Sequence, residues 1–197
     1  MEAVTNIVAT AVPLARSDVD TDQIIPSGWL KRVERTGFGA GLFSEWRSDP
    51  GFVLNQPAYA GAPILVAGPN FGTGSSREHA VWALMDYGFQ AVVSARFADI
   101  FRTNCTKAGL LPVEVDESVA SALLDAITAD PTILITIDVR ARRLVAEGAG
   151  VDAAFAMDPF TQWRFLEGLD DIALTLRHGD AINTFEARRP AWMPVTS

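Results

Sequence analysis

The sequence is poor in the side chains that hold metals. Its 197 residues include one cysteine, Cys105, and two histidines. A lone thiol forms no internal disulfide, and it supplies too few ligands for a structural zinc or an iron–sulfur cluster, since both take several thiolate or imidazole ligands. We therefore expect no metal site in this chain, and any metal chemistry must come from another molecule.

Long apolar runs and a surplus of positive charge are also missing. No stretch approaches the roughly 18 apolar residues of a membrane span, and residues 1–6 lack the basic and apolar pattern of a signal peptide. The 24 acidic against 16 basic residues give a net charge of −8, which disfavours nucleic acid phosphates and acidic membranes as partners. We expect a cytoplasmic protein.

Internal repeats, linkers and low-complexity segments are absent as well. The length and the 49% content of hydrophobic residues suit one globular domain. The last third of the chain has apolar residues at helical spacing. We therefore expect a single domain, 1–197, that includes C-terminal helices from about residue 161.

Short apolar runs bounded by turn residues predict an α/β fold. Buried strands are expected at 7–14, 63–68, 90–95 and 110–115. A helix capped by Ser75 or Ser76 and ended by Gly88 lies between the second and third of these runs, which predicts a parallel pair with a right-handed crossover. A helix at 118–129 and an antiparallel pair at 132–137 and 143–146 follow.

The segment from 27 to 57 is rich in glycine and has little periodicity, which indicates a long irregular excursion. Its aromatic side chains include Trp29, Phe38, Phe43 and Trp46. We expect the excursion to be mobile or poorly packed until a partner orders it. The alternative is that these aromatics pack under the domain's own sheet.

The loop from Gly68 to His79, Gly-Pro-Asn-Phe-Gly-Thr-Gly-Ser-Ser-Arg-Glu-His, joins a predicted strand to a predicted helix. At such a position a helix N-terminus offers free N–H groups to an anion, and Arg77 offers a fork for a carboxylate or phosphate. The spacing matches neither the dinucleotide fingerprint nor the Walker A loop nor the nucleophile elbow. The alternative is an ordinary capped turn with Arg77 in solvent.

Other side chains give weaker signals of chemistry. His79 is expected to pack or bond locally, His178 to be exposed, and Cys105 to be a small buried residue. A serine hydrolase using Ser75 or Ser76 with a histidine stays open, as does a non-catalytic carboxylate- or phosphate-binding module. The acidic turn around Asp20 has too few ligands for a calcium loop.

Two motifs together resemble a known family. Residues 71–80, Phe-Gly-Thr-Gly-Ser-Ser-Arg-Glu-His-Ala, and residues 20–26, Asp-Thr-Asp-Gln-Ile-Ile-Pro, resemble the swivelling domain of the aconitase superfamily. More narrowly, they are similar to the small-subunit family of 3-isopropylmalate dehydratase. The resemblance covers nearly the whole chain, including 96–101 and 163–176.

The resemblance implies a three-layer β/β/α domain with a mainly parallel sheet, a smaller antiparallel sheet and helices. It implies a separate large subunit that carries an iron–sulfur cluster, and a 2-hydroxy diacid as substrate. The family isomerises 2-isopropylmalate and 3-isopropylmalate through dehydration to isopropylmaleate, in leucine biosynthesis. A related hydro-lyase acting on citramalate or another 2-hydroxy diacid is the alternative.

The resemblance also implies roles for individual residues. Ser75 corresponds to the catalytic base, acting as an alkoxide, and Asp22 to an active-site acidic residue. Ser76 and Arg77 correspond to the carboxylate binders. The other substrate contacts are expected at Thr73, Gly74, Lys31 and Arg32, the last two in a loop that selects the substrate.

Overall fold

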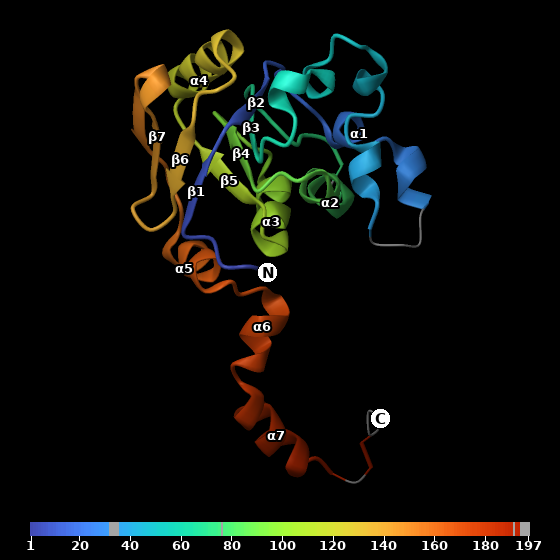
Figure 1. The fold of residues 1–197 in the computed structure, drawn as a ribbon. Helices are drawn as coiled ribbons and strands as arrows, with labels where there is room; N and C mark the ends of the chain where they lie inside the picture. The colour runs from blue at the N-terminus through green and yellow to red at the C-terminus, as the bar shows by residue number, and fades with distance from the viewer. Residues whose placement is uncertain (32–35, 76, 191, 194–197) are drawn as a thin grey trace.

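Two separate four-stranded sheets form the frame of the chain in the computed structural model, which describes all residues except 32–35, 76, 191 and 194–197 (Figure 1). The parallel sheet has the order β2 (Ala11–Leu14), β3 (Ile64–Ala67), β4 (Ala91–Ser94), β5 (Leu111–Glu114). The antiparallel sheet has the order β1 (Asn6–Ala9), β6 (Ile135–Asp138), β7 (Arg143–Ala146), β8 (Val151–Ala154). With their helices they make the expected α/β architecture.

The predicted single strand at 7–14 is wrong, because the chain changes sheets at Thr10. β1 pairs with β6, and β2 pairs with β3. All four residues of β2 are buried, whereas in β1 only Ile7 is. Pro13 fits β2 because this strand lies at the edge of its sheet, where a missing N–H breaks no ladder.

Helices cover both faces of the parallel sheet. α2 (Glu78–Tyr87) and α3 (Asp99–Ala108) connect β3 to β4 and β4 to β5, and they pack against each other. Right-handed crossovers put both on one face. α4 (Glu117–Ala129) packs across β2, β3 and β4 and reaches β8. The predicted helix at 118–129 and the antiparallel pair β6–β7 are confirmed, but α3 and β8 were not expected.

α2 begins two residues later than the Ser75 cap predicts. Arg77 is its N-cap residue, with extended backbone, and Gly88 ends the helix in the left-handed conformation, as expected. The carbonyl of Ser75 accepts hydrogen bonds from the Thr21 hydroxyl (2.9 Å) and from the Arg77 N–H (2.8 Å). These bonds keep Ser75 in the loop.

The described part of the segment 27–57 is packed, and the expectation that its aromatics await a partner is wrong for Phe38 and Phe43. Phe38 and Phe43 are fully buried, and Trp46 stacks on Phe43 with ring centroids 5.3 Å apart. The segment forms the short 3₁₀ helices η1 (Ser27–Lys31), η2 (Phe38–Gly41), η3 (Trp46–Ser48), η4 (Val53–Asn55) and η5 (Pro57–Tyr59). The Asp86 carboxylate on α2 accepts the N–H groups of Gly37 (2.6 Å) and Phe38 (2.8 Å), which ties the segment to the body.

Three helices follow one another at the C-terminal end of the chain, and the last two extend away from the body. α5 (Pro159–Glu167) packs at the end of the antiparallel sheet, and α6 (Asp171–Leu176) and α7 (Gly179–Ala187) form a C-terminal arm that reaches away from it (Figure 1). Over the described residues, no helix is long and apolar enough to cross a membrane. The single domain at 1–197 stays a prediction.

Replacing Phe43 with alanine tests whether the 27–57 segment is part of the core. Because its ring is fully buried, Phe43→Ala is expected to lower the free energy of unfolding by about 3–5 kcal/mol, measured by urea denaturation. Phe185→Ala is the matched control, since Phe185 is 67% exposed and its loss should change stability by less than about 0.5 kcal/mol. A loss below about 1 kcal/mol for Phe43→Ala would show that the segment is not packed as described.

Candidate active site

A short helix, α1 (Thr21–Ile24), begins just beyond the carboxyl end of β2. Asp20 caps it: the Gln23 N–H donates to the Asp20 carboxylate (2.8 Å), and the Asp20 N–H donates to the Gln23 side-chain oxygen (2.9 Å). This reciprocal capping box satisfies donors that the helix leaves free. The capping box therefore holds the acidic turn around Asp20 in one conformation.

The glycine-rich loop after β3 is bound to this turn through its backbone. The Gly72 N–H donates to the Val19 carbonyl (2.8 Å), and the Thr21 N–H donates to the Thr73 carbonyl (2.9 Å). The buried Thr21 hydroxyl adds its bond to the Ser75 carbonyl. The two motifs that carry the family resemblance are therefore one structural unit, and Thr21 is a supporting residue that the sequence did not single out.

Gly72 is needed for packing against α3. Its φ is +80°, and a Cβ atom built there would lie 2.2 Å from the Phe101 ring. Phe71 forms a parallel bridge with Phe97, just before α3. The glycine therefore lets the loop approach α3 closely.

A cavity of about 270 Å³ opens between the loop and α3. Its lining includes Thr21, Gly74, Ser75 and Arg77 on one side and Ala98, Asp99 and Ile100 on the other. Arg77 and Ala98 are the N-cap residues of α2 and α3, so two helix N-termini meet at this cavity. Their free N–H groups and dipoles favour an anion there. The sequence predicted the contribution of α2 but not that of α3.

Arg77 and Asp22, predicted from separate motifs, form an ion pair between Arg77 Nη1 and an Asp22 carboxylate oxygen. The Arg77 side chain is 21% exposed and that of Asp22 is 55% exposed. Arg77 is therefore oriented at the cavity edge, and the interpretation of Arg77 as a purely solvated charge is wrong. A guanidinium carries five N–H donors, so one ion pair leaves Arg77 with the capacity to bind a second oxyanion.

The remaining predicted site residues do not all lie at the cavity. Ser75 is exposed at the cavity, and Thr73 contributes through its backbone. Lys31 ends η1, after α1. Arg32 and Ser76 lie outside the described residues.

The alternative nucleophiles gain no support from their surroundings. His79 packs with its ring centroid 5.3 Å from that of Phe38 and 4.7 Å from that of Trp82, as expected for a locally packed histidine. Cys105 is fully buried, and burial raises the pKa of its thiol, so it is a small core residue. His178 is exposed. Within the described residues, no group of three or more His, Cys, Asp or Glu side chains could hold a metal ion.

Comparison with known proteins identifies the family. A family model described as the aconitase C-terminal domain matches residues 1–118, and one described as the C-terminal domain of the 3-isopropylmalate dehydratase small subunit matches 171–196. A 3-isopropylmalate dehydratase small subunit from Frankia casuarinae is 66% identical over 197 residues, the whole of both chains. The chain belongs to the 3-isopropylmalate dehydratase small-subunit family. The family predicted from the paired motifs, that of a hydro-lyase of leucine biosynthesis, is confirmed.

Less similar proteins support the same family and the same fold. The small subunit from Rubrobacter xylanophilus is 55% identical over 194 residues, 98% of each chain. The crystal structure of a 3-isopropylmalate dehydratase from Methanocaldococcus jannaschii superposes with a TM-score of 0.68 at 24% identity, over 92% of this chain and 99% of that one. This likeness confirms the expected fold of a parallel sheet, an antiparallel sheet and helices.

Replacing Thr21 with valine tests whether its hydroxyl holds the glycine-rich loop. Valine keeps the shape but loses the bond to the Ser75 carbonyl, which is worth about 1 kcal/mol. The Gly72 and Thr73 amides are therefore expected to exchange with deuterium up to about tenfold faster in Thr21→Val. Thr21→Ser, which keeps the hydroxyl, should retain the slower exchange. Unchanged exchange in Thr21→Val would show that the hydroxyl does not hold the loop.

Proposed function

We propose that this chain is the small subunit of an enzyme that interconverts 2-isopropylmalate and 3-isopropylmalate through isopropylmaleate. The observation that carries the proposal is the meeting of Ser75 and Arg77 with the N-termini of α2 and α3 at one cavity. A dicarboxylate suits this cavity, because helix N-termini and a guanidinium favour carboxylate oxygens. The family relationship supplies the particular substrate.

In this proposal Ser75 is the base. A deprotonated Ser75 Oγ takes a proton from the carbon beside a substrate carboxylate, and the C–H electrons form the double bond. The hydroxyl of the neighbouring carbon leaves as water with a proton from a second acidic group of the assembled site, and rehydration returns both protons. Adding water back with the opposite orientation completes the isomerisation. A serine hydroxyl is a weak acid, so its anion needs a positive field. The helix N-termini and Arg77 supply that field.

Arg77 is proposed to bind a substrate carboxylate while Asp22 holds its guanidinium in place. Asp22 is thus proposed as an active-site acidic residue, the role that the family resemblance implies for it. We propose Ser76, Thr73 and Gly74 as further substrate contacts in the same loop. Lys31 and Arg32, which follow α1, are proposed to select the substrate's side chain or its second carboxylate.

An iron–sulfur cluster does not fit this chain. Its one cysteine is buried, and the described residues offer no metal-ligand group. We therefore assign the cluster to a large subunit, with which this chain forms a heterodimer or a higher assembly. The proton transfer to Ser75 and the carboxylate binding by Arg77 use only this chain's own residues. We also propose a cytoplasmic location, in which the free thiol stays reduced.

Replacing Ser75 tests the base assignment in the assembled enzyme. In a complex of the full chain with its cluster-loaded large subunit, Ser75→Ala is expected to lower kcat by roughly 10²- to 10⁴-fold, the contribution of a general base. KM should change little, because a base acts mainly in the transition state. Ser118→Ala is the matched control, since Ser118 is an exposed serine on α4. Steady-state kinetics with both isomers measures these effects.

The opposite pattern would contradict the assignment. If Ser75→Ala raised KM and kept kcat, Ser75 would be a ligand contact rather than a base. The isolated chain should have no activity, and isomerase activity from it alone would contradict the need for a large subunit. Turnover of citramalate in place of isopropylmalate would move the proposal to the related hydro-lyases.

A further inference from the structure

The C-terminal arm presents an apolar surface that nothing in the described structure covers. Ile172, Leu176, Phe185 and Trp192 are 72%, 69%, 67% and 77% exposed. No strand or other helix of the described residues packs extensively along α6 or α7. Large apolar side chains gathered on one element mark an interaction surface, because water contact with them is unfavourable.

The apolar side chains of the arm lie at helical spacing. Ile172 and Leu176 are four residues apart on α6, so they share a face, and Ile182 and Phe185 are three apart on α7. α6 has six residues and α7 has nine, well below the roughly 12–15 residues that an isolated helix needs in water. Helices this short need a partner surface to stay folded.

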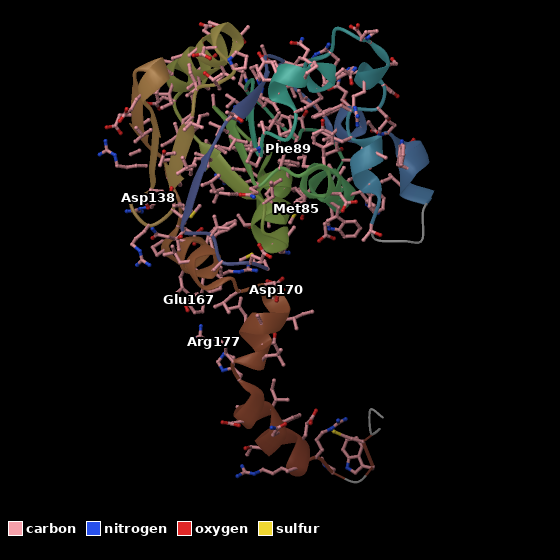
Figure 2. The ribbon with its side chains drawn as sticks, viewed as in Figure 1. Met85, Phe89, Asp138, Glu167, Asp170 and Arg177 are labelled. Carbon is pink, nitrogen blue, oxygen red and sulfur yellow. The ribbon has the colours of Figure 1, made fainter. Side chains whose placement is uncertain are left out.

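The base of the arm is fixed to the body. The Met1 amino group donates to the Asp170 carboxylate (3.0 Å), which also caps α6 by accepting the Ala173 N–H (2.8 Å). The Arg164 side chain, 9% exposed, reaches Asp171 with its Nη2 (2.8 Å) and the Leu169 carbonyl with its Nε (3.0 Å). The arm therefore leaves the body in a set direction, and Figure 2 shows Asp170 at its base and Arg177 farther along it.

This base lies at the end of the parallel sheet opposite to the candidate active site. A Cβ atom on Gly109, just after α3, would lie 3.0 Å from Met1. The other end of α3, with Asp99 and Phe101, lines the site cavity. The ten residues of α3, about 15 Å of helix, therefore separate the arm's base from the site.

We propose that the C-terminal arm is the docking element for the large subunit, at a contact separate from the catalytic interface. This inference rests on the proposed function. Two family models match different parts of the chain: residues 1–118 match one described as the aconitase C-terminal domain, and 171–196 match one described as the C-terminal domain of the 3-isopropylmalate dehydratase small subunit. A domain within a longer chain is held near its partner by its linker, at millimolar effective concentration, whereas a separate subunit must supply binding surface of its own. The arm is that added surface.

The test uses the full chain with Ile172→Ala, Leu176→Ala and Phe185→Ala combined, since alanine keeps the helices while removing the apolar surface. Asn183→Ala with Thr184→Ala on α7 is the matched control, since both residues are exposed polar ones. The Kd for the purified, cluster-loaded large subunit is measured by biolayer interferometry. The kcat is measured at saturating large subunit.

We expect the triple variant to raise Kd by at least about tenfold, the effect of losing interface anchors, while kcat at saturation stays within about twofold of wild type. The control should leave both unchanged. An unchanged Kd in the triple variant overturns the proposal. This holds even if the wild-type chain uses the arm to bind a second copy of itself. An unchanged Kd with a lowered kcat overturns it too. If the wild-type chain did not bind the large subunit at all, the proposed function itself would be wrong. The Kd measured for the wild-type chain decides this before any variant is tested.

Discussion

The candidate site depends on the parallel pairing of two backbone segments, Val19–Thr21 and Gly72–Ser75. Four hydrogen bonds join them: three between backbone groups and one from the Thr21 hydroxyl to the Ser75 carbonyl. The parallel pairing of β2 with β3 brings both segments to the same end of the sheet. Because each segment follows directly on its strand, the pairing of two buried strands fixes where the serine and the arginine lie.

This pairing of the two segments has a chemical consequence. It holds Ser75 and Arg77 in the turn before α2, and Gly72 lets the same turn press against Phe101 of α3. The N-termini of both helices therefore border one cavity, where both dipoles favour an anion. Ser75 itself remains exposed. An exposed serine beside two helix N-termini and a guanidinium suits the proposal that a second subunit completes the site.

Much of the fold could be predicted from local pattern. The parallel unit from β3 to β4 follows from two apolar runs and from Gly88, and the pair β6–β7 follows from alternation. The switch at Thr10 could not be predicted, because an apolar run does not show which sheet it joins. α3 was missed because polar residues dominate it, and its buried side chains, Phe101 and Cys105, give a weak periodic signal. The packing of Phe38 and Phe43 depends on contacts distant in sequence.

The site was predicted as separate pieces. Motif resemblance indicated Ser75, Arg77 and Asp22, but the ion pair between Arg77 and Asp22 joins residues 55 apart in sequence. Local spacing carries no information about such a contact. The same holds for the second helix N-terminus at the cavity, since α3 reaches it only through the folding of β4 beside β3.

A structure of the assembled enzyme with an unreactive dicarboxylate analogue tests the role of the 72–77 loop most directly. We predict the Ser75 Oγ about 3–3.5 Å from the carbon that loses its proton, with the Arg77 guanidinium on the adjacent carboxylate. The N-termini of α2 and α3 should face that ligand. An analogue bound away from the 72–77 loop, with Ser75 still facing solvent, would contradict the assignment of this loop as the catalytic site.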